Sequence, residues 1–76
     1  MEYSKEEKVL RIINESLLAN GKIPIKKLNY NNSLREDLEI DSFTMVEIVV
    51  KFEEEFGIDI FEGGMINKVE DLLKLI

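Results

Sequence analysis

The side chains of this sequence that could do chemistry are carboxylates and hydroxyls, because its 76 residues include no cysteine and no histidine. Thiolate metal sites, zinc sites and Ser-His-Asp triads are therefore excluded. Asp37, Glu39 and Asp41 have the spacing of the first three ligands of an EF-hand loop. The loop fails because its sixth position is Ser42 instead of glycine and its twelfth is Ile48 instead of glutamate. We therefore expect neither a metal site nor a catalytic residue.

The length of the chain suits a single small domain over residues 1–76. Hydrophobic residues make up 45% of it, which is enough for a core. Its 16 acidic and 10 basic residues give a net charge of −6, whereas a nucleic-acid-binding domain needs a basic surface. The polar start is unlike a signal peptide, and no apolar run reaches the roughly 18 residues of a membrane span. We expect a cytoplasmic monomer that contacts neither nucleic acid nor membrane.

Hydrophobic spacing predicts three main helices in a small antiparallel all-α bundle. The first should begin at Ser4, which forms a capping box with Glu7, and stop at residues 20–21. The last should be short, with Asn67 as its cap and Glu70 completing the box.

A long connector of residues 22–41 follows the first helix, and in so small a domain its length suggests a function. A capping box of Ser33 and Glu36 predicts one short extra helical turn within it. At most one further turn is expected within residues 58–66. The apolar residues that should hold the connector against the core are Ile23, Ile25, Leu28, Leu34 and Leu38.

The second helix should run from Asp41 or Ser42 to Phe56, and it carries two apolar stripes instead of one. The first stripe is an ordinary core face and consists of Met45, Ile48, Val49, Phe52 and Phe56. The second stripe is smaller and consists of Phe43, Val46 and Val50. The carboxylates that flank it are Glu47, Glu53 and Glu54. A small apolar stripe rimmed by carboxylates is typical of a docking site, and packing against the connector is the alternative.

Charge is unevenly distributed along the chain. Residues 1–35 carry a net charge of +3, residues 36–62 carry −9, and residues 63–76 are neutral. The acidity is therefore concentrated on the second helix and its flanks. Such a field speeds association with a basic partner surface, although most acidic helix faces are merely solvated.

Three stretches together resemble the acyl carrier protein family, whose pattern is D-L-x-x-D-S-L, then V-E-L, then E-E-x-F-G-I-x-I. In this chain they are residues 37–43 (DLEIDSF), 46–48 (VEI) and 53–60 (EEEFGIDI). The match covers about half of the chain, and the rest agrees in outline. The length is also that of a freestanding carrier.

The resemblance implies that a phosphopantetheinyl transferase attaches 4′-phosphopantetheine from coenzyme A to Ser42, and that Asp41 helps the transferase to bind. The thiol of the arm would then carry acyl or aminoacyl groups as thioesters. The free N–H groups and positive dipole at a helix N-terminus would favour the attached phosphate. An ordinary capping role is the alternative for Ser42 or Asp41.

The protein itself would not be an enzyme. Its partners would be acyl-transferring, ligase or synthase enzymes with basic docking surfaces. The residues that they would read are Phe43, Val46, Glu47, Val50, Glu53 and Glu54.

Three departures from the family pattern bear on these partners. Phe43 stands where leucine is frequent. Thr44 stands where aspartate is common, and Lys51 stands where a small or apolar residue is usual and could partly neutralise Glu47. Fatty acyl groups and amino acids both remain candidates for the cargo. A rival from another class is a helical adaptor without a prosthetic group, which binds a basic or amphipathic partner through the second stripe.

Overall fold

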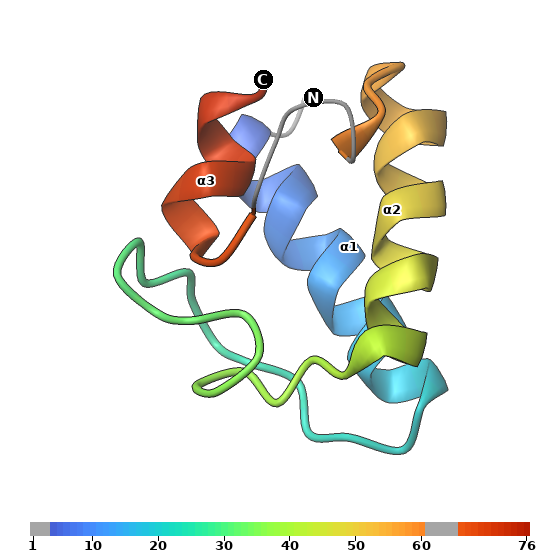
Figure 1. Cartoon of the computed structure of the whole chain (residues 1–76), viewed down its shortest axis with the longest axis vertical. Helices are drawn as coiled ribbons and strands as arrows, with labels where there is room; N and C mark the ends of the chain where they lie inside the picture. The colour runs from blue at the N-terminus through green and yellow to red at the C-terminus, as the bar shows by residue number, and fades with distance from the viewer. Residues whose placement is uncertain (1–3, 61–65) are drawn as a thin grey trace.

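Three helices form the described part of the protein: α1 (Lys5–Ala19), α2 (Ser42–Phe56) and α3 (Val69–Lys74). The computed structural model describes residues 4–60 and 66–76, so most of the turn predicted within residues 58–66 lies outside the described residues. Helices α1 and α2 lie side by side in opposite directions, and α3 packs against α1 (Figure 1). Apart from one isolated β-bridge, this part of the chain contains no strand, which confirms the predicted all-α bundle. None of its helices is long and apolar enough to span a membrane.

The ends of α1 and α2 lie where the capping residues predict them. Before α1, the Ser4 hydroxyl oxygen accepts the backbone N–H of Glu7 at 3.1 Å. Before α2, the Asp41 carboxylate accepts the backbone N–H of Thr44 at 2.8 Å. After α2, Gly57 adopts a left-handed conformation with φ of 68°, which ends the helix. Local sequence therefore determines these boundaries.

The start of α3 differs from the prediction by one residue. Lys68 precedes the helix instead of Asn67, and Asp71 takes the place predicted for Glu70. The Asp71 carboxylate accepts the N–H groups of Asn67 at 3.0 Å and Lys68 at 2.9 Å, which hold its pKa below the ordinary value. A β-bridge between Ser33 and Lys68 also joins the connector to the residue that precedes α3.

The core lies between the helices and the buried part of the connector. The residues that α1 contributes are Val9, Ile12, Ile13 and Leu17. Those of α2 are the buried Ile48, Val49 and Phe52 with the half-buried Met45 and Phe56. Phe52 is fully buried, and its ring centroid lies 4.8 Å from that of Phe56. Burying a side chain of this size stabilises the fold by about 1.5–3 kcal/mol, so the first apolar stripe is the core face, as predicted.

The connector contains the predicted turn at Ser33. The Ser33 carbonyl accepts the backbone N–H of Asp37 at 3.0 Å, and the Ser33 hydroxyl oxygen accepts that of Glu36 at 3.2 Å. The apolar connector residues that reach the core are Ile25, Leu28, Leu34, Leu38 and Ile40. The connector is therefore packed against the bundle, although it forms no regular helix.

The prediction that Ile23 contacts the core is wrong, because its side chain is 87% exposed. The chain is held on either side of it. Before it, the Lys22 ammonium donates a hydrogen bond to the Glu39 carbonyl. After it, the Asn14 side chain accepts the Ile25 N–H at 2.8 Å and donates to the Ile25 carbonyl at 2.9 Å. Ile23 lies between these two anchors and faces solvent.

Backbone hydrogen bonds join the connector to the entry of α3. The Leu34 N–H donates to the Asn67 carbonyl at 2.9 Å, and the Val69 N–H donates to the Asn32 carbonyl at 3.1 Å. The connector then folds back on itself, since the Ile40 N–H donates to the Leu34 carbonyl at 3.0 Å. These bonds place the end of the connector beside the first turn of α2 (Figure 1).

Candidate functional site

Ser42 is the first residue of α2, and its side chain is exposed. The residue that caps the helix is its neighbour Asp41, whose Oδ1 accepts the Thr44 N–H. The Ser42 hydroxyl therefore takes no part in capping the helix. The sequence allowed an ordinary capping role for Ser42 or for Asp41. In the structure Asp41 is the N-cap and Ser42 is not.

The second carboxylate oxygen of Asp41 is also engaged. Lys22 Nζ lies 3.2 Å from Asp41 Oδ2 and also donates to the Glu39 carbonyl, so the first residue of the connector is tied to its last residues, just before α2. The Thr44 N–H and then the Lys22 ammonium lower the pKa of Asp41 to about 2. Asp41 is therefore ionised at neutral pH and is too weak a base to deprotonate a hydroxyl.

A second cation lies beside the serine. Arg35 Nη2 donates a hydrogen bond to Ser42 Oγ at 3.4 Å from the turn in the connector. Neither Arg35 nor Lys22 was predicted as a site residue from the sequence, since neither has a motif spacing to Ser42. The capping box at Ser33 predicts a turn in the connector but not which side chain of that turn faces α2. The packing of the connector against the bundle decides that.

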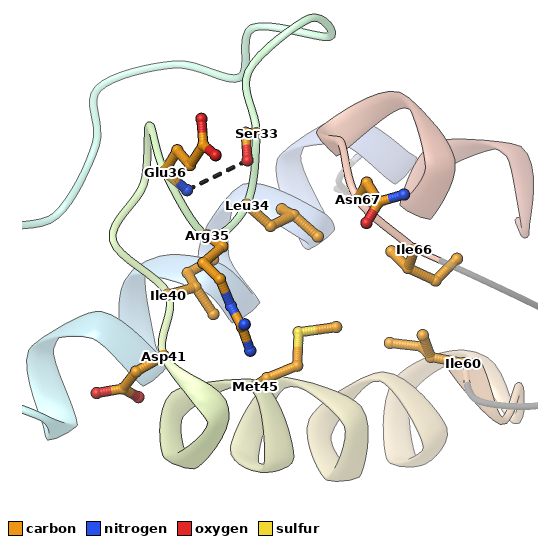
Figure 2. Close-up of a pocket in the computed structure, with 10 residues that line it drawn as sticks. All are labelled: Ser33, Leu34, Arg35, Glu36, Ile40, Asp41, Met45, Ile60, Ile66 and Asn67. Atoms are coloured by element: carbon orange, nitrogen blue, oxygen red, sulfur yellow. Dashed lines mark hydrogen bonds between the residues drawn. The ribbon is translucent and has the colours of Figure 1, made fainter.

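Two hollows meet at this point of the surface. The first is an open groove of about 600 Å³ lined by Lys22, Arg35, Glu36, Glu39, Ile40, Asp41 and Ser42. The second is a pocket of about 480 Å³ between the connector, α2 and the entry of α3, shown in Figure 2. Its apolar wall includes Leu34, Met45, Ile60 and Ile66. Arg35 lines both hollows, and in Figure 2 its guanidinium points toward α2.

The second apolar stripe of α2 is exposed. Phe43 is 72% exposed, Val46 is 56% exposed and Val50 is 49% exposed. Packing against the connector, the alternative left open by the sequence, is therefore wrong. Of the carboxylates on its rim, Glu53 and Glu54 are exposed.

The departures from the family pattern at Thr44 and Lys51 have different consequences. Thr44 is fully buried, so it does not face a docking partner. Lys51 Nζ lies 3.3 Å from Glu15 on α1, and within residues 4–60 and 66–76 its ion pair is with Glu15 and not with Glu47. The expectation that Lys51 neutralises Glu47 is therefore wrong, because the nearer carboxylate belongs to the neighbouring helix.

A small helical bundle that presents an exposed serine hydroxyl at the start of its second helix has the architecture of a carrier domain. The comparisons with known proteins agree. The chain matches the family described as "Phosphopantetheine attachment site" over residues 7–75. This protein belongs to the acyl carrier protein family.

Its relatives include acyl carrier proteins from three bacteria. That of Rickettsia bellii (strain RML369-C) is 36% identical over 73 residues, which are 93% of this chain and 80% of the relative. That of Acidothermus cellulolyticus is 40% identical over 67 residues, or 88% of this chain and 79% of the relative. That of Thermobifida fusca is 31% identical over 78 residues, or 100% and 98% of the two chains. No solved structure matches significantly.

Membership of this family implies a covalently attached 4′-phosphopantetheine. Proteins of this family are carriers and not catalysts, and they interact with synthase and transferase enzymes. The start of α2 fits such a group, since Ser42 is exposed and takes no part in capping. The first N–H groups of a helix lack intrahelical acceptors and favour a negative charge, and Arg35 adds a cation beside them.

Proposed function

We propose that Ser42 is the attachment site of 4′-phosphopantetheine and that this protein carries acyl or aminoacyl groups as thioesters on the arm. The observation that carries the proposal is the division of labour at the start of α2, where Asp41 caps the helix and Ser42 Oγ stays exposed. The arm supplies a thiol, which the 76 residues of the chain lack. The protein supplies the position of the arm and a surface for its partners.

In the attachment reaction, Ser42 Oγ forms a bond to the pantetheine-bearing phosphorus of coenzyme A. The pyrophosphate bond breaks, and 3′,5′-ADP leaves. The hydroxyl proton must pass to a base of the transferase, because Asp41 has a pKa of about 2 and binds protons too weakly. Asp41 contributes a fixed negative charge next to the serine, which a basic transferase surface can recognise.

The partner enzymes should read the exposed stripe of α2. Phe43, Val46 and Val50 offer apolar contacts, and the acids beside them are Glu47, Glu53 and Glu54. Contacts through an exposed acidic rim are screened by salt, so partner binding should weaken as ionic strength rises. Weak contacts suit a carrier, because its cargo passes between successive enzymes.

The test is incubation of the purified protein with a phosphopantetheinyl transferase and coenzyme A, followed by an intact mass and a thiol count. We expect a gain of one phosphopantetheine and one thiol in the wild type and in Ser4→Ala, and no gain in Ser42→Ala. Ser4 is a matched control, since it is also an exposed serine at the N-terminus of a helix. Attachment to Ser42→Ala would place the arm elsewhere, and no attachment with several broad-range transferases would overturn the proposal.

The exposure of the second stripe also favours the rival function, an adaptor without a prosthetic group that binds a basic or amphipathic partner. The two functions differ at Ser42. An adaptor would bind its partner equally well as wild type and as Ser42→Ala, whereas a carrier would lose its cargo in that variant. Loading of the holo protein by an amino-acid ligase or by a fatty-acyl ligase would then identify the class of cargo.

A further inference from the structure

We propose that Arg35 binds the phosphodiester of the arm on Ser42 and fixes the direction in which the arm leaves the protein. The inference rests on the proposed attachment to Ser42. Its starting point is the contact of Arg35 Nη2 with Ser42 Oγ at 3.4 Å. A guanidinium that donates to a neutral hydroxyl keeps its full charge available for an anion at the same place.

The two cations beside Ser42 differ in how far they are already engaged. Lys22 binds the Asp41 carboxylate and the Glu39 carbonyl, so its charge is matched before any arm is attached. Arg35 has no ion pair within residues 4–60 and 66–76, and its hydrogen bond there is the one to Ser42. Arg35 is therefore the cation that is available to pair with a new negative charge.

The carboxylates around Arg35 do not compete strongly with a phosphodiester for its guanidinium. Asp41 is committed to Thr44 and Lys22. Glu36 and Glu39 line the groove and are exposed to solvent, which screens their electrostatic attraction to the guanidinium. A phosphodiester on Oγ would place its two free oxygens next to the atom that Arg35 already contacts. A planar guanidinium fork matches such a pair of oxygens better than an ammonium does.

The position of Arg35 also gives the arm a direction. Its side chain lines both the groove at Ser42 and the neighbouring pocket, and it extends from the connector toward α2 (Figure 2). A phosphodiester bound to Arg35 would lie on the connector side of α2. The exposed stripe that includes Phe43 and Val46 would stay uncovered, so the arm and a docked enzyme would not compete for the same surface.

The test compares apo and holo forms of the wild type, Arg35→Gln, Arg35→Lys and Arg11→Gln, after the mass of each holo protein has been verified. Arg11 is the matched control, because it lies on α1 and pairs with Glu15 and Glu55. The readouts are the 31P chemical shift of the phosphodiester, the 15N–1H signal of the Arg35 Nε group, and Tm at low and high salt.

We expect attachment to shift the Arg35 Nε signal in the wild type and to raise Tm by about 1–4 °C at low salt, as an exposed charge pair would in a domain of this size. Arg35→Gln should lose this gain and change the 31P shift, Arg35→Lys should keep part of the gain, and Arg11→Gln should keep all of it. The role of Arg35 would be overturned if holo wild type and holo Arg35→Gln, each of verified mass, had the same 31P shift and the same Tm gain. The attachment proposal would then remain intact. Failure of every form to gain mass would overturn both.

Discussion

Lys22 Nζ lies 3.2 Å from Asp41 Oδ2, so an ion pair joins the first residue of the connector to the residue immediately before Ser42. The same ammonium donates to the Glu39 carbonyl, which holds the last residues of the connector as well. The approach of the chain to α2 is thus held by the two contacts of Lys22 and by the capping bond to Thr44. Ser42 is presented from a well-anchored part of the backbone.

Replacing Lys22 by glutamine should raise the pKa of Asp41 from about 2 toward its ordinary value of 3.8 without reaching it. The reason is that the Thr44 N–H, the larger cause of the low pKa, remains in place. Carboxyl 13C shifts followed by NMR from pH 1.5 to 6 measure this. Lys26→Gln is the control, and a rise of the Asp41 pKa in that variant as well would mean that general charge, not the ion pair, is responsible.

The Asp41 carboxylate should also make the stability of the fold depend on pH in acidic solution. The pKa of Asp41 is lowered on folding, so its contribution to stability is present above pH 3.8 and is lost as pH falls toward about 2. Asp41→Asn keeps a capping oxygen but removes the charge. The difference in Tm between wild type and Asp41→Asn should be constant above about pH 5 and shrink between pH 4 and 2. A difference independent of pH over that window would contradict this linkage.

Glu39 adopts a left-handed backbone conformation with φ of 56°, which is strained for any residue with a Cβ atom. Glu39→Gly should relieve the strain and raise the free energy of unfolding by about 0.5–1 kcal/mol, after the entropy cost of glycine in the unfolded chain. The bond from Lys22 survives this change because it goes to the backbone carbonyl. Glu39→Ala, which removes the carboxylate but keeps the Cβ, should give no comparable gain in urea unfolding.

The exposed stripe and the buried stripe of α2 should respond differently to truncation. Phe43 is 72% exposed, so Phe43→Ala should change the free energy of unfolding by less than about 0.5 kcal/mol. The same variant should weaken binding to the transferase by about tenfold, as loss of a central aromatic contact does. Phe52→Ala, in the core, should cost about 3–5 kcal/mol of stability. Unchanged transferase affinity in Phe43→Ala, measured by titration calorimetry, would remove Phe43 from the docking surface.

Local interactions made much of this protein predictable from its sequence. The capping residues Ser4, Asp41 and Gly57 act on backbone groups within a few residues of themselves, so they determine where α1 begins and where α2 begins and ends. The spacing of apolar residues likewise predicts which face of α2 is buried, because helical periodicity is a property of the segment alone. The position of Ser42 at the start of α2 follows from these local terms.

Packing between distant segments decided the rest. The sequence allowed the second stripe of α2 to be covered or exposed, and the path of the connector left Phe43 exposed. The bridge from Ser33 to Lys68 joins the connector to the entry of α3, a contact that the spacing of residues does not predict. Lys22 reaches Asp41, and Arg35 reaches Ser42, because the connector folds back on itself before α2. The sequence by itself therefore determined the helices and the serine, while the electrostatic surroundings of the serine arise from long-range contacts that no spacing along the chain encodes.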